Sequence, residues 1–245
     1  MSASIARSRA SDICTPRCVA AEVVRKVGAD VGIAVDGDAD RVIMINHKGE
    51  VLDGDRVIAL CARQLHERGQ LTGGGVVTTV MSNLGLDAYL AGLGLETVRT
   101  QVGDRYVVEA MRAGGYNLGG EQSGHVILLD RSTTGDGLMT ALQILAVMAR
   151  QKCALSDLLP EFHTHPQCMI NINVSERRPM EDLPEFAAAV ADVETKLGDG
   201  GRVLIRYSGT ELKARVMVEG LDEELVESSA SFLAETLEKA LSGTG

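Results

Sequence analysis

The stretch VGIAVDGDADRVIMI, residues 31 to 45, places three aspartates between two apolar runs. The flanking runs have the length and composition of short β-strands, so the aspartates fall in the loop that connects them. Asp36, Asp38 and Asp40 occupy every second position of that loop, and such closely spaced negative charges repel each other unless a cation neutralises them. We refer to residues 36–41 as the acidic loop.

Several interpretations of the acidic loop make different demands on the residues around it. A calcium EF-hand needs a glycine after the third acid and a glutamate at loop position twelve, where this sequence has Arg41 and His47. A phosphatase of the haloacid dehalogenase type needs Thr or Val where Asp40 stands. A Mg²⁺ ion held by carboxylates, with Arg41 beside it for a phosphate oxygen, suits the residues present. A solvated acidic turn is the plain alternative.

Helices and strands alternate through most of the chain, which is typical of α/β proteins. The helix predicted at 55–68 is amphipathic, whereas the one at 135–151 is apolar nearly all round and is predicted to be buried. The order of elements changes after LPEFHTHPQ, near residue 164. We therefore expect α/β domains with mixed sheets followed by a smaller α+β C-terminal domain. The predicted domains are 1–68, a partial α/β domain with the acidic loop, 69–163, a further α/β domain, and 164–245.

Two further loops have the composition of ligand-binding segments. In the glycine-rich loop, GGEQSGH at 119–125, Glu121 can accept hydrogen bonds from sugar hydroxyls and Ser123 can donate or accept them. In the arginine loop, residues 206–215, Arg206 and Arg215 can contact a phosphate. Backbone N–H groups and hydroxyls can also bind it there, from Ser208, Gly209 and Thr210. Taken alone, each loop equally fits an ordinary turn.

Composition limits the classes of partner. The net charge of −10 disfavours nucleic acids and acidic membrane surfaces, because binding to phosphate backbones needs clustered cations. The longest apolar stretches are shorter than the ~20 residues of a membrane-spanning helix. The first 18 residues lack the apolar core of a secretory signal, and five scattered cysteines do not suggest a disulfide framework. We expect a cytoplasmic protein.

The three motifs occur in one order, and together they resemble the α-D-phosphohexomutase superfamily. DGDADR is similar to the family's magnesium loop, GEQSGH to its sugar-binding loop and RYSGTE to its C-terminal phosphate-binding loop. The resemblance covers roughly residues 18 to 245. It implies phosphohexomutase-type domains and an isomerase reaction, in which a phosphoserine exchanges phosphoryl groups with a hexosamine phosphate through a bisphosphate intermediate.

The resemblance also implies a role for each motif residue. Asp36, Asp38 and Asp40 would bind Mg²⁺, with Arg41 catalytic beside the transferring phosphoryl group. The glycine-rich loop would hold the sugar through Glu121, Ser123 and His125, although a buried or capping histidine is an equal alternative for the last. The phosphate that is not transferred would be held by Arg206, Ser208, Gly209, Thr210 and Arg215.

One part of the family pattern is not found in these residues. The family's nucleophile lies in a Ser-His-Asn segment well before the magnesium loop, and none of the five histidines here follows a serine. We therefore expect the nucleophile to come from outside these 245 residues, either in a longer native product or in a separate chain that carries the missing N-terminal domain. The alternative is a non-catalytic remnant that still binds sugar phosphates.

Overall fold

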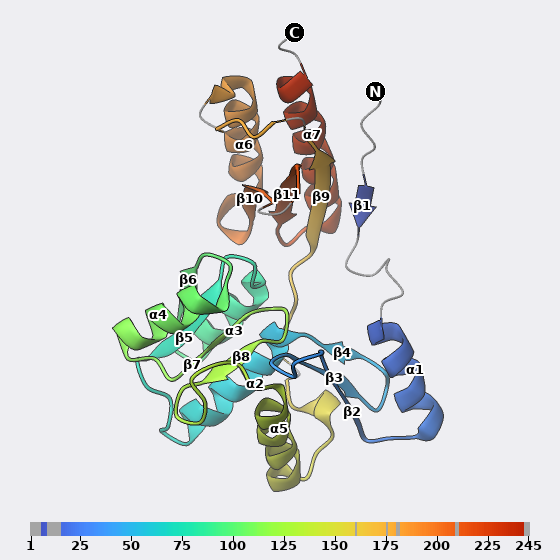
Figure 1. Cartoon of the computed structure of the whole chain (residues 1–245), viewed down its shortest axis with the longest axis vertical. Coiled ribbons are helices and arrows are strands. Elements are labelled where there is room, and N and C mark those ends of the chain that lie inside the picture. Colours follow the sequence, from blue (N-terminus) through green and yellow to red (C-terminus); the bar gives the residue numbers. More distant parts are fainter. Residues whose placement is uncertain are drawn as a thin grey trace. The chain divides into compact units, whose positions relative to one another are not determined.

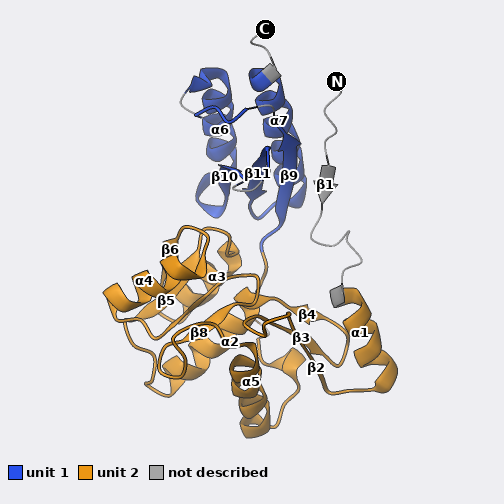
Figure 2. Cartoon of the chain, in the orientation of Figure 1, with its two compact units in different colours: residues 1–13, 165–245 blue, residues 14–164 orange. Residues whose placement is uncertain are grey.

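The computed structural model describes residues 6–8, 16–159, 161–174, 176–179, 182–208 and 211–242. The chain forms two compact units, one of residues 1–13 with 165–245 and one of residues 14–164, coloured blue and orange in Figure 2. Each unit has its own hydrophobic core. The division of the first 163 residues at position 68 stays a prediction.

The larger unit begins with a small antiparallel sheet built around the acidic loop (Figure 1). β2 (Val31–Val35) and β3 (Val42–Asn46) pair along their full lengths, as the two apolar runs predict. A short third strand, β4 (Val51–Leu52), follows beside β3, and α1 (Pro16–Val27) contacts β2 and β3. The acidic loop is therefore fixed at the tip of a paired hairpin.

A second sheet in this unit is mixed, as predicted. Its order is β6-β5-β7-β8, with β5 parallel to both neighbours and β8 antiparallel to β7. The strands are β5 (Gly75–Thr79), β6 (Glu96–Thr100), β7 (Leu118–Gly120) and β8 (Val126–Leu128), and the associated helices are α3 (Leu84–Gly92), α4 (Asp104–Gly114) and α5 (Gly137–Gln151). β7 was not predicted, because two of its three residues are glycines, which disfavour strands.

Two helices of this unit are buried differently from the sequence expectation. The prediction that α5 is buried all round is wrong, since Leu138 and Leu142 are 57% and 60% exposed. Conversely, α2 (Gly54–Glu67) was predicted to be amphipathic, yet residues 57–62 are all buried. α2 contacts β3 and β4 of one sheet and β7 and β8 of the other. Composition alone does not show how many sheets a helix will contact.

The smaller unit is an antiparallel sheet with two helices packed against it. The strand order is β1-β9-β11-β10, and α7 contacts β9 and β11 while α6 contacts β10. The strands are β1 (Ala6–Ser8), β9 (Gln167–Asn173), β10 (Arg202–Tyr207) and β11 (Lys213–Glu219), and the helices are α6 (Pro184–Leu197) and α7 (Glu223–Ser242). These elements complete the predicted fold class, α/β followed by a smaller α+β part.

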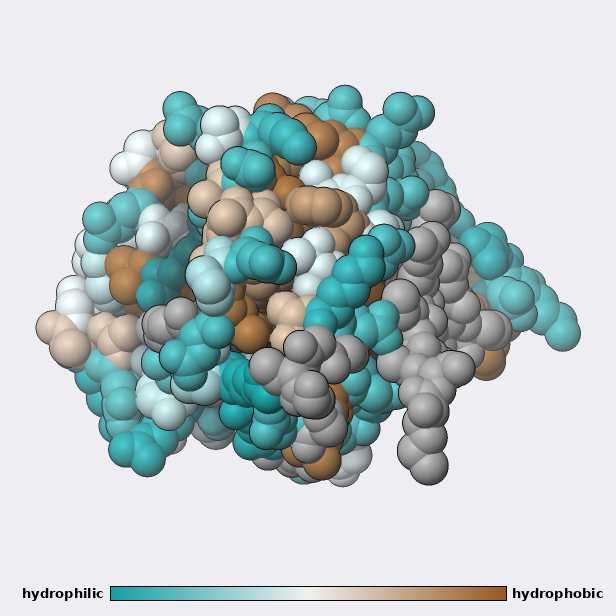
Figure 3. Space-filling view, turned by 90° about the horizontal axis from the view of Figure 1, so that it is seen from above, coloured by the Kyte–Doolittle hydropathy of each residue, from teal (hydrophilic) through white to brown (hydrophobic). Residues whose placement is uncertain are grey.

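The surface shown in Figure 3 is largely hydrophilic, with hydrophobic residues lying among the polar ones. Apolar side chains scattered in this way are ordinary on protein surfaces, so only a concentration of them calls for an explanation. Within the described ranges, the helices do not combine the length and the apolarity that crossing a bilayer requires.

Candidate active site

The acidic loop bends so that its carboxylates converge. One carboxylate oxygen from each of Asp36, Asp38 and Asp40 lies within 4.8 Å of the other two. Ala39 has φ +60°, in the left-handed region that residues other than glycine adopt only at a cost. Its carbonyl accepts a hydrogen bond of 2.9 Å from the amide of Gly137, at the start of α5. The start of α5 thus helps to hold the loop in this conformation.

Arg41 is held beside two of these carboxylates. Its amide donates to Asp36 Oδ1 at 3.2 Å, and its Nε lies 3.7 Å from both Asp36 Oδ2 and Asp40 Oδ1. Desolvation raises the pKa of Asp36, but the hydrogen bond from the Arg41 amide and the charge of Arg41 outweigh this and lower it below its ordinary value. Asp36 is therefore held in its ionised form, with one arginine beside it.

The acidic loop fits a hard divalent cation. Asp40 Oδ1 is buried but accepts no hydrogen bond within the described part of the chain. A buried acceptor without a donor is costly, and a metal ion removes that cost. Three carboxylate oxygens are also the ligand type that Mg²⁺ prefers. The donor set and this unsatisfied oxygen therefore suit the predicted metal.

His125 connects the acidic loop to the glycine-rich loop. Its Nε2 accepts a hydrogen bond of 3.1 Å from the amide of Gly135, so its Nδ1 carries the proton and donates to Asp40 Oδ2 at 3.1 Å. The side chain is 3% exposed. Since both ring nitrogens have protein partners, this geometry favours positioning of Asp40 over the sugar contact predicted for His125.

The glycine-rich loop is a tight turn between β7 and β8. Glu121 Oε1 accepts a hydrogen bond of 3.0 Å from the amide of Gly103, which fixes one carboxylate oxygen. Ser123 Oγ is buried and has no hydrogen-bond partner among the described residues. A buried hydroxyl of this kind is available to a ligand that can reach it. The sugar contacts of Glu121 and Ser123 stay predictions, and the geometry leaves the Ser123 hydroxyl without a competing partner among the described residues.

Backbone hydrogen bonds join the two loops. The amide of Val42, directly after the acidic loop, donates to the carbonyl of Gly124 at 3.1 Å. The amide of Gly54, at the start of α2, donates to the carbonyl of Gln122 at 3.0 Å. A Cβ at Gly54 would lie 2.1 Å from the carbonyl oxygen of Glu121, so only glycine permits this approach. The structure thus brings together the loops predicted to bind the metal and the sugar.

The arginine loop belongs to the smaller unit, where two like charges face each other. Arg206 on β10 is the register partner of Arg215 on β11, on the opposite side of the strands from the buried Ala214 and Val216. Desolvation lowers the pKa of Arg206, and the charge of Arg215 lowers it further. Arg215 Nε is buried without a hydrogen-bond partner in the described ranges. Such a pair is destabilising unless an anion lies between the guanidinium groups.

Ser208 lies at the end of β10 beside this pair. It is 5% exposed, its amide donates to the carbonyl of Lys213 at 2.8 Å, and its Oγ accepts from the amide of Glu211 at 3.3 Å. The predicted contacts of Gly209 and Thr210 fall outside the residues that the structure describes.

Sequence reasoning missed the glycines that begin two helices. Asp53 and Asp136 cap α2 and α5, and the residues after them, Gly54 and Gly137, contact the two loops. A Cβ at Gly137 would lie 2.7 Å from the carbonyl oxygen of Arg41. The repeated Asp-Gly pair before a helix was the available signal, because aspartate is a preferred helix cap and glycine allows a close backbone approach.

Comparison with known families agrees with the geometry. Residues 53–165 match the family model described as "Phosphoglucomutase/phosphomannomutase, alpha/beta/alpha domain III", and residues 169–236 match the same family's "C-terminal domain". The chain therefore belongs to the phosphoglucomutase/phosphomannomutase family, which confirms the predicted phosphohexomutase resemblance.

Curated relatives that this chain matches include phosphoglucosamine mutases. The chain is 54% identical over 223 residues to a phosphoglucosamine mutase of Nitratidesulfovibrio vulgaris strain Miyazaki F, and 50% identical over 222 residues to one of Myxococcus xanthus. Each alignment covers 91% of this chain but only 50% and 48% of the respective relative. The chain thus spans about half the length of the curated relatives it matches.

Solved structures show the same fold. The N-acetylphosphoglucosamine mutase of Aspergillus fumigatus, in complex with GlcNAc-6P and magnesium, matches with a TM-score of 0.71 at 22% identity, over 85% of this chain and 48% of that one. A phosphoglucomutase/phosphomannomutase family protein of Burkholderia thailandensis matches with a TM-score of 0.72 at 23% identity, over 96% and 53% of the two chains.

Proposed function

We propose that this chain forms the part of a phosphoglucosamine mutase that binds the metal, the sugar and the phosphate that is not transferred. The reaction would interconvert glucosamine 6-phosphate and glucosamine 1-phosphate through a bisphosphate intermediate. One observation carries the proposal: Asp40 Oδ1, Ser123 Oγ and Arg215 Nε are buried atoms without hydrogen-bond partners in the described ranges, one in each predicted loop. A cation, a hydroxyl and a phosphate oxygen would satisfy them respectively.

In this proposal the acidic loop serves phosphoryl transfer. Asp36, Asp38 and Asp40 hold a Mg²⁺ ion, which when bound neutralises negative charge on the transferring group. Arg41 donates hydrogen bonds to the same phosphoryl oxygens, because its guanidinium is held beside the metal ligands and is half exposed. Stabilisation of spread negative charge is the main requirement of this chemistry.

The glycine-rich loop orients the sugar. Glu121 accepts from hydroxyl groups while the Gly103 amide holds its carboxylate in place, and Ser123 donates to or accepts from a neighbouring hydroxyl. His125 acts indirectly, by fixing Asp40. Because the bisphosphate must be held in two orientations, these groups would contact hydroxyls that occupy similar places in both.

The arginine loop binds the phosphate that stays on the sugar. Arg206 and Arg215 give charge-assisted contacts, and the anion removes the repulsion between their facing guanidinium groups. Ser208 lies at the end of the same strand, and the predicted contacts of Gly209 and Thr210 belong to this role.

In this proposal the phosphoserine comes from outside these 245 residues, and the sheet of β2, β3 and β4 has an edge suited to receive its domain. β2 pairs only with β3 among the described strands, so its other edge offers free backbone hydrogen-bonding groups. Ile33 and Val35 on β2 are exposed, on the face they share with their buried register partners Met44 and Val42.

Exposed apolar side chains are numerous on β2 and on the two helices that contact it. α1 and α5 both contact β2, and together these elements carry seven of the twelve large apolar side chains that are exposed in the described ranges. The seven are Val19, Val23, Val27, Ile33, Val35, Leu138 and Leu142. Such a concentration marks a protein interface. Since the relatives are about twice as long, we infer that their other half adds a strand and apolar cover here.

Reconstitution tests the function. The chain is mixed with the phosphorylated half of the Myxococcus xanthus relative that it does not match, and glucosamine 1-phosphate is followed by phosphorus NMR after addition of glucosamine 6-phosphate, Mg²⁺ and a trace of bisphosphate. We expect turnover in the mixture and none with either part alone. Ile33→Lys should weaken association, whereas Leu221→Lys, an equally apolar exposed position in the smaller unit, should not.

Two outcomes separate the candidates. The proposed mutase function is wrong if the mixture is inactive although the two parts associate and the intact relative is active. If calorimetry then still shows binding of glucosamine 6-phosphate, the non-catalytic remnant is the correct interpretation; the lack of a Ser-His segment in this sequence is what keeps that candidate open.

A further inference from the structure

A cavity of about 270 Å³ lies in the larger unit between α2, α5 and the end of β8. Its apolar floor is formed by side chains of Leu65, Leu128, Ile144 and Val147, together with Cys61. Burial raises the pKa of the Cys61 thiol to about 12, so this sulfur stays neutral and adds no negative charge. The floor therefore suits a short aliphatic group.

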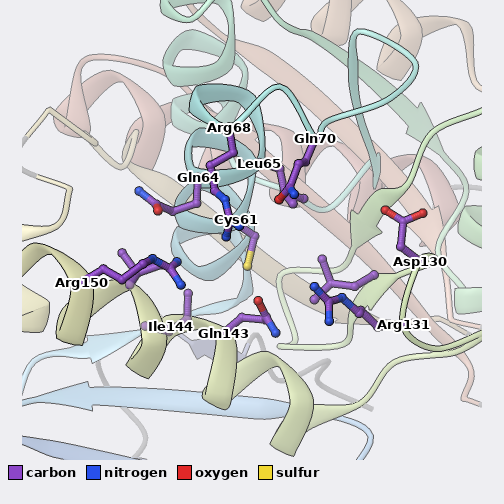
Figure 4. A pocket seen from close by; sticks show the side chains of 12 residues that line it. Cys61, Gln64, Leu65, Arg68, Gln70, Asp130, Arg131, Gln143, Ile144 and Arg150 are labelled. Atoms are coloured by element: carbon purple, nitrogen blue, oxygen red, sulfur yellow. The ribbon is translucent and has the colours of Figure 1, made fainter.

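Three arginines surround this floor. Figure 4 shows Arg68, Arg131 and Arg150 on three sides of the cavity, with their guanidinium groups directed towards its centre, where the Cys61 sulfur lies. The lining contains one carboxylate, Asp130, which accepts a hydrogen bond of 2.6 Å from Asn117. Three positive charges against one negative charge make the cavity basic in a protein of net charge −10.

The three cavity arginines do not form ion pairs with carboxylates within the described ranges, unlike six other arginines there. Ion pairs are formed by Arg41, Arg63, Arg99, Arg105, Arg178 and Arg202. No ion pair within the described ranges involves Arg68, Arg131 or Arg150, and the same holds for Arg206 and Arg215 of the arginine loop. The arginine loop likewise groups guanidinium groups that form no ion pairs, whereas the cavity arginines are exposed and share their cavity with one carboxylate, Asp130.

The cavity is separate from the candidate active site. α2 and α5 begin at Gly54 and Gly137, which contact the glycine-rich and acidic loops. The cavity is lined by residues 61–65 and 143–150 of these helices, roughly ten residues further on, which at 1.5 Å per residue is about 15 Å along each helix axis.

We propose that this cavity is a second ligand site, which binds a small organic anion with a carboxylate or phosphate head and a short aliphatic body. The head contacts Arg68, Arg131 and Arg150, and the body covers the floor formed by the apolar residues. The lining contains no aromatic side chain, so stacking of a nucleobase is not part of its recognition. A bound ligand connects α2 with α5.

The probes are inorganic phosphate and glutarate, and the readout is the rate at which N-ethylmaleimide labels Cys61, followed by peptide mass mapping. Because the Cys61 thiol is buried and neutral, labelling requires transient opening of the cavity, and a bound ligand suppresses that opening. Cys61 lies in the cavity, whereas Cys153 is outside its lining and serves as the internal control. We expect glutarate to slow labelling of Cys61 without changing that of Cys153. Protection by phosphate alone would assign a phosphate head, and protection by glutarate alone a carboxylate head.

Variants connect the protection to the arginines. Arg131→Gln and Arg150→Gln should each raise the glutarate concentration needed for protection by about tenfold, the usual effect of losing one charge-assisted contact. Arg112→Gln, on the exposed surface of α4, is the matched control and should leave it unchanged. Arg215→Ala should also leave it unchanged, so failure here is distinguishable from failure of the proposed mutase function.

The proposal is overturned if neither probe protects Cys61 in the folded chain. It is equally overturned if protection persists unchanged in the double variant Arg131→Gln/Arg150→Gln, because the anion would then act elsewhere. Circular dichroism of each variant confirms that the fold is retained.

Discussion

Replacement of Asp55 by asparagine should make the larger unit more stable at alkaline pH. Asp55 is the second residue of α2 and is fully buried. Desolvation raises its pKa from 3.8 to about 7, and the charge of Asp53 raises it too, whereas hydrogen bonds from Asn83 and Ser82 and the charge of Arg99 act in the opposite direction. The carboxyl is thus held where ionisation is unfavourable.

The sign and size of the effect follow from proton linkage. Between pH 3.8 and about 7 the folded chain keeps a proton at Asp55 that the unfolded chain has lost, so the free energy of unfolding falls as pH rises. The slope is up to about 1.4 kcal/mol per pH unit, which over this interval amounts to about 4 kcal/mol. Asparagine has no charge to bury, and its carbonyl can still accept the 2.8 Å hydrogen bond from the Asn83 amide.

The assay is urea unfolding followed by circular dichroism at pH 5 and pH 8. Only the part of the interval between pH 5 and about 7 contributes, so we expect the wild-type chain to lose about 2–3 kcal/mol more than Asp55→Asn, with Asp30→Asn, an exposed aspartate, behaving like wild type. Equal losses in the wild-type and Asp55→Asn chains would refute the reasoning, because the buried ionisation would then not contribute to stability.

Further predictions concern the candidate site itself. Arg215→Ala should weaken binding of glucosamine 6-phosphate by about 1.5–3 kcal/mol in calorimetry, and an affinity equal to that of the Arg112→Ala control would contradict the phosphate assignment. His125→Ala should lower Mg²⁺ affinity by about 10–100-fold, and unchanged metal titrations would show that it does not position Asp40. Gly54→Ala should destabilise the chain by about 1–3 kcal/mol in urea unfolding, whereas Gly92→Ala, which has open space around it, should be neutral or stabilising.

The sequence predicted those features that depend on local pattern. The apolar runs beside the acidic loop became β2 and β3, since β-branched residues on both sides of a turn favour a hairpin. The predicted fold class was also confirmed, because it was read from the alternation of helices and strands along the chain, which is a local pattern. The convergence of Asp36, Asp38 and Asp40 also follows from their spacing in one short loop.

Features that depend on distant contacts could not be predicted in this way. β7 forms because its neighbours β5 and β8 supply hydrogen bonds to a segment with little strand preference of its own. The role of His125 depends on Gly135 and Asp40, the latter 85 residues away in the sequence. The exposure of Leu138 and Leu142 on α5 could not be predicted either, because the pattern of apolar residues does not show which apolar face of a helix is buried and which is exposed.

The three predicted loops differ in whether the energetic effects of their substitutions should be coupled. The acidic and glycine-rich loops share the hydrogen bonds of Val42 with Gly124 and of His125 with Asp40, so a change in one loop must disturb the other. The arginine loop instead takes its geometry from the pairing of β10 with β11 in the smaller unit. The quantity to compare is the binding free energy of glucosamine 6-phosphate in the presence of Mg²⁺. The losses caused by His125→Ala and Arg215→Ala should be nearly additive in the double variant, whereas those of substitutions at His125 and Ser123 should not be.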